Sequence, residues 1–153
     1  MEIRRPSFLP DPALSREEME SLQRDIASAA VFADDHSFDP ASVGVSGVGD
    51  ATVDEGSDQS RLGADPPLVA GVDQAFRDDE AISAVVVMRG GEVVERAHAV
   101  EETEIPYIPG LLSFREGGAI LAALTALDRD PDLLFVDGSG RIHFREAGLA
   151  THV

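Results

Sequence analysis

The chain has 153 residues, of which 43% are hydrophobic, so it is long enough for one compact domain and too apolar to be wholly disordered. Cysteine is absent, which excludes disulfides, thiolate metal sites and a cysteine nucleophile. No apolar run approaches the roughly 18 residues that a membrane-spanning helix needs, and no apolar stretch follows Arg4 and Arg5, as it would in a secretory signal. A cytoplasmic globular protein is the expectation.

The charge is strongly acidic. The formal net charge is −17, and all 12 basic residues are arginines. The acidic residues are spread along the chain, so two interpretations stay open: an ordinary solvated surface, or adaptation to concentrated salt, where a Debye length of about 3 Å at 1 M screens self-repulsion. The absence of lysine favours the second. Taken alone, this charge argues against a nucleic-acid partner, whose usual footprint is a basic patch.

The first predicted element is a helix near the N-terminus. Ser15 lies three residues before Glu18, which is the spacing of a capping box. Apolar residues such as Leu22 and Ile26 then recur at helical spacing. The pattern predicts an amphipathic helix over about 17–31 that covers the core.

The chain divides into three predicted regions. Residues 1–35 form the N-terminal helix region. Residues 36–67 are rich in Gly, Ser, Asp and Pro without any period, which is typical of a flexible linker or loop. The ordered core is expected over residues 68–153.

Three predicted strands open this core. Residues 68–73 (LVAGVD) form a short apolar strand that carries a carboxylate, and residues 82–88 (ISAVVVM) are a continuous, mostly β-branched run. Residues 92–100 return after the dipeptide Gly90-Gly91, which is typical of a tight hairpin turn. The first three strands are therefore expected to be antiparallel.

A helix and a fourth strand follow. Prolines flank residues 105–109, which predicts an extended segment. Residues 113–127 carry an apolar stripe at helical spacing, and residues 132–136 form a buried strand. Because a helix crosses over between them, the fourth strand should lie parallel to the first. This order is the front half of a ribonuclease H-like mixed α/β fold.

Three carboxylates occupy informative places: Asp73 in the first strand, Glu116 near the start of the second predicted helix, and Asp137 at the end of the fourth strand. If the first and fourth strands are neighbours, Asp73 and Asp137 come together and Glu116 can reach them from the first turn of its helix. Carboxylate oxygens of this kind are the ligands that Mg²⁺ prefers. The pattern favours a metal site for phosphodiester chemistry.

Each carboxylate also has a plainer interpretation. A carboxylate inside an apolar strand such as Asp73 is rarely only structural, because a buried charge needs a partner. Asp137-Gly138 could be an ordinary turn at the end of a strand. Glu116 could simply favour a helix N-terminus through the macrodipole. The residues alone leave these alternatives open.

The residues around these carboxylates carry a resemblance. VAGVDQAF, YIPGLLSFRE and DLLFVDGSGRIHFREAGLATH occur in that order, and together they resemble the endonuclease V family. The resemblance covers residues 68–152 and, more weakly, the helix with Leu22 and Gln23. It implies a DNA-repair endonuclease that hydrolyses a phosphodiester 3′ to deoxyinosine with Mg²⁺, or with Mn²⁺ instead. YIPGLLSFRE disfavours an unrelated ribonuclease H-like nuclease, while inosine-containing RNA stays open as a further substrate.

The resemblance also implies roles for particular residues. Asp73, Glu116 and Asp137 would be the metal-binding and catalytic carboxylates. A second group would form the wedge that keeps the duplex open where the lesion base has left the stack, and a third would form the pocket for the flipped base. The wedge residues are Pro106, Tyr107, Ile108 and Pro109, and the pocket residues are Gly110, Leu112, Gly138, Gly148 and Leu149.

The sequence departs from the family pattern at two places near the site. Ser139 lies where the family usually has His, and His143-Phe144-Arg145 replaces the family's His-Pro-Arg. By the resemblance His143 would contact the phosphate or the metal-bound water, and a structural role is the alternative.

The largest departure is at the end of the sequence. The family continues with another strand, a lysine near the active site and further helices, whereas this sequence stops at Val153 and contains no lysine. Two interpretations stay open. The chain is such an endonuclease or its front part, with a separate polypeptide supplying the rest, or it is an inactive remnant or nucleic-acid-binding fragment that retains wedge and pocket without cleaving. Alone, the chain is expected to be inactive or nearly so.

Overall fold

The computed structural model describes residues 1–33, 36–40, 43 and 65–153. Most of the predicted linker over residues 36–67 lies outside the described residues, so the division into three regions stays a prediction. Within the described part, no helix is long and apolar enough to cross a membrane.

The first helix begins at the predicted capping box. After the short 3₁₀ turn η1 (Pro6–Phe8), α1 runs over Arg16–Ala29. The Ser15 hydroxyl accepts the Glu18 N–H at 3.3 Å, and the Glu18 carboxylate accepts the Ser15 N–H at 2.8 Å. These bonds satisfy two backbone donors that a helix start otherwise leaves unpaired. The helix ends two residues earlier than predicted.

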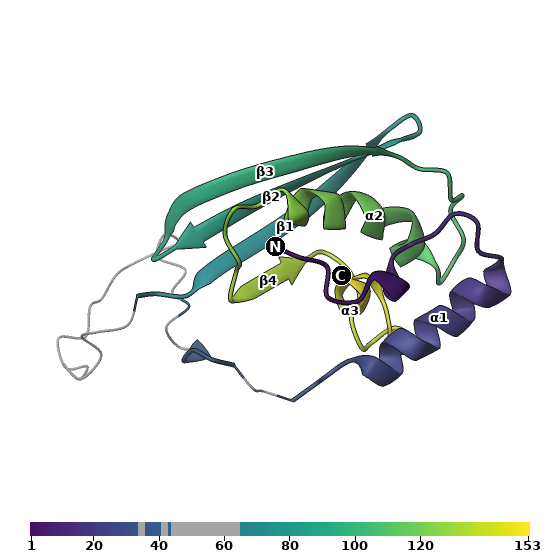
Figure 1. Ribbon diagram of the computed structural model, residues 1–153, viewed down its shortest axis with the longest axis horizontal. Coiled ribbons are helices and arrows are strands. Elements are labelled where there is room, and N and C mark those ends of the chain that lie inside the picture. The colour runs from purple at the N-terminus through teal and green to yellow at the C-terminus, as the bar shows by residue number, and fades with distance from the viewer. Residues whose placement is uncertain (34–35, 41–42, 44–64) are drawn as a thin grey trace.

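Four strands form one mixed sheet in the order β3-β2-β1-β4, as Figure 1 shows. The pairs β1–β2 and β2–β3 are antiparallel, and β4 is parallel to β1, with Val72 opposite Val136. The predicted ribonuclease H-like arrangement is confirmed. The strands are β1 (Leu68–Arg77), β2 (Glu80–Arg89), β3 (Glu92–Glu102) and β4 (Leu133–Val136).

The two hairpin turns explain the strand lengths. Gly90 and Gly91 both have positive φ, at 58° and 86°, as a two-residue hairpin turn between twisted strands requires. β1 extends four residues beyond its predicted end, because β2 supplies pairing partners as far as Arg77 opposite Glu80. The turn that joins them places Asp78 at φ 56°, a conformation that Asp tolerates better than most residues.

One face of the sheet is covered by α2 (Leu112–Thr125), as Figure 1 shows. Ala70, Val85 and Val87 lie on this face and pack in one cluster with Ile120 and Leu124 of the helix. Full burial of such a side chain contributes about 1.5–3 kcal/mol, so this layer holds the sheet and α2 together. Alternate strand residues point to the other face, where exposed side chains include Met88, Val100 and Phe135.

A smaller cluster ties α1 to the segment between β3 and α2. Met19 of α1 packs with Ile105, Leu111 and Phe114. The prediction that this helix covers the core therefore holds for this smaller cluster, whereas the main cluster between the sheet and α2 contains no residue of α1. The cluster also anchors the segment that carries the predicted wedge.

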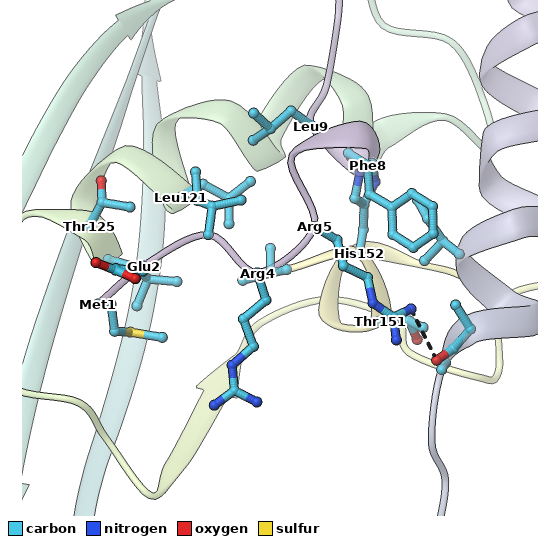
Figure 2. Close-up of a pocket in the computed structure, with 16 residues that line it drawn as sticks. Met1, Glu2, Arg4, Arg5, Phe8, Leu9, Leu121, Thr125, Thr151 and His152 are labelled. Atoms are coloured by element: carbon cyan, nitrogen blue, oxygen red, sulfur yellow. Dashed lines mark hydrogen bonds between the residues drawn. The ribbon is translucent and has the colours of Figure 1, made fainter.

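The N-terminal segment lies beside the last helical turn, α3 (Leu149–His152). Figure 2 shows His152 next to Phe8, whose carbonyl lies 2.6 Å from the imidazole Nε2. A mostly apolar cavity of about 320 Å³ lies between this segment, α1, α2 and α3. None of the predicted site residues lines it, and the buried His152 has a structural role through its contact with Phe8.

Candidate active site

Asp73 and Asp137 leave adjacent strands at the same level. Val72 of β1 and Val136 of β4 are aligned across the parallel pair, and each aspartate is the next residue in its strand direction. β4 ends at Val136, whereas β1 continues to Arg77. The two carboxylates therefore lie at the end of β4, where β1 continues without a neighbour on that side, and both are exposed. Residues that bind a ligand from solvent are expected to be exposed in this way.

Glu116 approaches the same place from α2. Because the helix begins at Leu112, Glu116 is its fifth residue, and the first turn holds no acidic residue. The prediction that Glu116 lies in the first turn is wrong, so the macrodipole does not explain its position. Its half-buried side chain instead lines a cavity of about 210 Å³ together with Asp73 and Asp137.

The electrostatics of this cavity favour positive charge. Burial raises the pKa of Glu116, and the nearby Asp137 carboxylate raises it further, while the Arg115 guanidinium opposes both effects. Two carboxylates that must ionise close together destabilise each other unless a cation lies between or beside them. A bound cation would relieve this repulsion.

The three carboxylates line the cavity without forming a closed cage. Among the residues that the structure describes, no three His, Cys, Asp or Glu side chains lie close enough together to hold a metal ion. Strand alternation explains why the carboxylates do not surround one point. Gln74 lies on the face of the sheet that α2 covers, so its neighbour Asp73 points to the opposite face. Oxygen donors of this kind still fit Mg²⁺ or Mn²⁺, which bind through one or two carboxylates and keep several waters.

Gln74 is a site residue that the sequence analysis missed. Its amide Nε2 donates to the Ser83 hydroxyl at 2.8 Å and to the Glu116 carbonyl at 3.0 Å. Its Oε1 is buried, and none of the residues that the structure describes donates a hydrogen bond to it. Gln74 therefore ties β1 and β2 to α2 directly beside Glu116. The sequence contains a sign of this role, because Gln74 is a polar residue at a position of β1 that faces α2.

Arg115 is the second missed residue. Its guanidinium donates to the Ile105 carbonyl at 2.6 Å and lies over the Phe76 ring at 5.0 Å. These contacts fix a positive charge next to Glu116 and join the start of α2 to Ile105, near the beginning of the segment between β3 and α2.

The predicted wedge presents its tyrosine to solvent. Tyr107 is 67% exposed, whereas Ile105 before it is buried and Ile108 after it packs against the cluster around α1. The Leu111 N–H donates to the Ile108 carbonyl at 2.9 Å, and Gly110 closes this turn at φ 83°. The anchoring of Ile105 and Ile108 and a tight turn thus accompany an aromatic side chain that faces solvent.

The predicted pocket glycines lie where the backbone is closely packed. A Cβ on Gly110 would lie 2.7 Å from the Phe144 ring, and one on Gly138 would lie 2.8 Å from the Leu149 Cβ. A Cβ on Gly148 would lie 2.1 Å from the Ser139 carbonyl oxygen. None of these positions accepts a side chain without movement. Two further predicted pocket residues, Leu112 and Leu149, line the carboxylate cavity.

His143 lies apart from the carboxylates. It is not among the residues lining their cavity, and its Nδ1 accepts the Arg145 N–H at 3.2 Å. Burial lowers the pKa of His143, and the positive charge of Arg145 lowers it further, while a hydrogen bond to the Gly110 backbone opposes them. The structure therefore places His143 beside the turn that follows the wedge.

The two arginines nearest His143 are engaged elsewhere. Arg145 pairs with Glu20 at 2.9 Å. Arg141 lies 3.7 Å from Glu146 and stacks over Phe32. Neither guanidinium is directed to the carboxylate cavity in this conformation.

A mixed sheet with one aspartate on each of two parallel neighbours and a glutamate on the crossing helix defines a protein of the ribonuclease H-like class. Comparison of the sequence with known proteins shows to which family within this class the chain belongs. The model of the family described as "Endonuclease V" matches residues 52–153. The chain therefore belongs to the endonuclease V family.

Two relatives in that family have similar sequences along nearly the whole chain. An endonuclease V of Haloarcula marismortui is 60% identical over 97% of this chain, and one of Natronomonas pharaonis is 61% identical over 99%. Both organisms are halophilic archaea. The matches cover 55% and 54% of those relatives, so the chain spans about half the length of the curated relatives it matches.

Solved structures agree in fold. The endonuclease V of Streptomyces avermitilis is 33% identical with a TM-score of 0.67, over 90% of this chain and 51% of that one. An endonuclease V of Ciona intestinalis, crystallised with a 23mer DNA containing an inosine, is 20% identical with a TM-score of 0.66, over 91% of this chain and 53% of that one.

Proposed function

We propose that this chain carries the metal-binding carboxylates and the lesion-recognition elements of a cytoplasmic DNA-repair endonuclease that hydrolyses a phosphodiester 3′ to deoxyinosine. The observation that carries the proposal is the cavity lined by Asp73, Glu116 and Asp137 in a member of the endonuclease V family. The Ciona relative, crystallised with inosine-containing DNA, supports the substrate class.

Asp73 and Asp137 would hold Mg²⁺ or Mn²⁺, with Glu116 as the third donor at the cavity. When bound, the ion supplies a Lewis acid that activates water and neutralises charge at the phosphodiester. The residues of the chain itself position this chemistry. Gln74 fixes the backbone of Glu116, and Arg115 holds the start of α2 against the wedge segment.

Tyr107 would act as the wedge. Its ring is exposed, while the buried Ile105 and the partly buried Ile108 anchor the segment that carries it, so its face can stack on a base at the gap. The tight backbone at Gly138 would then lie at the edge of a flipped base, while the Gly148 N–H already donates to the Gly140 carbonyl at 3.2 Å and supports the turn.

The acidic surface is compatible with this function in concentrated salt. At molar salt, counterion release contributes little affinity to any DNA-binding protein. Binding would then depend on phosphate contacts through the metal, on stacking and on the base pocket, none of which needs a basic patch.

A second function is a binding fragment that recognises deoxyinosine without cutting. The observation that favours it is the engagement of Arg141 and Arg145 away from the carboxylates, in a chain with no lysine. Removing one preorganised charge-stabilising group costs about 10²–10³ in rate. A separate polypeptide that supplies such a group would restore turnover.

The test is an incubation of the purified chain with an oligonucleotide duplex containing one deoxyinosine, in molar KCl with Mg²⁺ or Mn²⁺. Site-specific nicking on the 3′ side that is lost in Asp73→Asn supports the endonuclease, even when slow. Selective binding without nicking supports the binding fragment. If the chain neither binds nor nicks the duplex, both functions are contradicted. A parallel arm with inosine-containing RNA decides between the two substrates.

A further inference from the structure

Gln23 is a buried polar residue on α1, far in sequence from the wedge and from the carboxylates. It is only 1% exposed, in a helix whose other two buried residues are Met19 and Ile26. A buried amide without hydrogen-bond partners destabilises the folded state. Its contacts therefore show what the residue does.

The Gln23 amide joins two turns of the chain. Its Nε2 donates to the Gly110 carbonyl at 3.1 Å and to the Ala147 carbonyl at 2.6 Å. These partners lie 87 and 124 residues away. One belongs to the turn that follows the wedge, and the other directly precedes Gly148. A single side chain on α1 thus sets the separation of two predicted base-pocket segments.

Arg145 forms the second half of this contact. Its Nη1 donates to the Gln23 Oε1 at 3.0 Å and to the Gly110 carbonyl at 3.3 Å. Its Nη2 pairs with Glu20, one turn before Gln23 on α1, at 2.9 Å. The side chain is only 14% exposed. Because Glu20 and Gln23 both hold Arg145, the guanidinium cannot rotate without breaking several bonds.

The clamp formed by Gln23 and Arg145 also places an aromatic ring. The Arg145 guanidinium lies 4.4 Å from the centre of the Phe144 ring. That ring packs so closely on Gly110 that a Cβ there would meet it at 2.7 Å, and yet Phe144 is 72% exposed. The clamp therefore fixes the backbone at Gly110 together with an open aromatic face beside it.

We propose that Gln23 is a positioning residue for lesion recognition, which holds the Gly110 and Ala147 backbones at the separation that a flipped purine requires. This inference rests on the proposed function and deepens it by assigning the N-terminal helix to base selection. Gln23 acts through the two turns and does not touch the carboxylates.

The chemistry explains why glutamine is needed. Its planar amide supplies two N–H donors for two carbonyls and one oxygen for Arg145. Methionine has a similar volume and supplies none of these. Glutamate would direct carboxylate oxygens at two carbonyl oxygens, although its pairing with Arg145 would remain.

The experiment compares Gln23→Met and Gln23→Glu with the wild type and with Asp25→Asn, a control on the exposed side of α1. Fluorescence anisotropy in molar KCl and EDTA measures affinity for a labelled duplex with one deoxyinosine and for the same duplex without it. We expect both Gln23 variants to lose about tenfold in preference for the deoxyinosine duplex, which corresponds to about 1.4 kcal/mol. Affinity for the plain duplex should not change.

Hydrogen exchange followed by mass spectrometry supplies a readout independent of DNA. In Gln23→Met, peptides containing Gly110 and Ala147 should exchange faster, while peptides from β1 and β2 keep wild-type rates. Faster exchange throughout the chain would mean general destabilisation and would overturn the positioning role. Unchanged preference together with unchanged exchange would overturn it as well.

Two further outcomes are informative. If Gln23→Met does not fold, Glu20→Gln tests the clamp from the Arg145 side, with a loss of preference of a few-fold expected and an unchanged preference counting against the clamp. If the wild type itself shows no preference for deoxyinosine, either in EDTA or after Mg²⁺ replaces the EDTA, the proposed function fails. The exchange rates would then still decide whether Gln23 holds the two turns together.

Discussion

Asp73 and Asp137 lie next to each other because they follow residues that are aligned across the parallel pair of β1 and β4. Asp73 belongs to β1, and Asp137 directly follows the last residue of β4. The strand pairing itself sets their spacing, and Gln74 then connects this pair to α2 through the Glu116 carbonyl.

Tyr107→Ala should weaken binding of deoxyinosine DNA by about 1–3 kcal/mol, the range measured for loss of one base-stacking aromatic. Tyr107→Phe keeps the stacking face and should bind like the wild type. Stability should change little in either variant, because the side chain is exposed. Anisotropy titrations measure the effect, and equal affinity of the wild-type and Tyr107→Ala proteins would remove the wedge assignment.

The stability of the chain should fall as the pH drops below about 6.5. Burial lowers the pKa of His152, while its hydrogen bond to the Phe8 carbonyl opposes this shift. An unfolded histidine has a pKa of about 6.5, so the unfolded state binds more protons than the folded state below that value. The contribution of neutral His152 to the free energy of unfolding is fully present above the pKa of the unfolded state. It is lost as the pH falls towards the pKa of His152 in the folded state.

Urea unfolding at pH 7.5 and 5.5 measures this dependence. His152→Gln keeps a nitrogen donor for the Phe8 carbonyl but cannot titrate, so its stability should change less between the two pH values. His98→Gln is the matched control, because it removes an exposed histidine of β3. An unchanged slope in His152→Gln would show that another group is responsible.

Salt should stabilise the fold partly by screening the repulsion between two carboxylates on neighbouring strands. Glu80 of β2 and Glu102 of β3 are directly opposite each other, and like charges in that arrangement are destabilising. Glu102→Gln should therefore raise the unfolding midpoint in low salt, with the gain shrinking in molar KCl as screening replaces it. Equal gains at both salt concentrations would mean that the effect is not electrostatic.

Much of the fold could be predicted from the sequence, because local patterns determine it. The capping box at Ser15, the glycine pair at Gly90 and the apolar strand runs each depend on neighbours a few residues away. The crossover helix then implied the parallel pairing of β1 with β4. The adjacency of Asp73 and Asp137 followed from that pairing.

The parts that could not be predicted depend on contacts between distant segments. Glu116 was assigned to the first turn because the start of α2 was placed one residue late, at Ser113 instead of Leu112. Gln23 gave only a weak family signal, since its partners Gly110 and Ala147 are distant in sequence. The engagement of Arg145 by Glu20 was equally invisible, because no local spacing relates the two residues.

The most direct test of the account is Mn²⁺ binding to the purified chain, followed by electron paramagnetic resonance in molar KCl. Asp73→Asn and Asp137→Asn each remove one oxygen ligand from the cavity, and Asp79→Asn changes an exposed turn as the control. We predict that the wild type and Asp79→Asn bind Mn²⁺ alike, while both cavity variants bind it at least tenfold more weakly. Equal Mn²⁺ affinity in all four proteins would contradict the assignment of this cavity as the metal site.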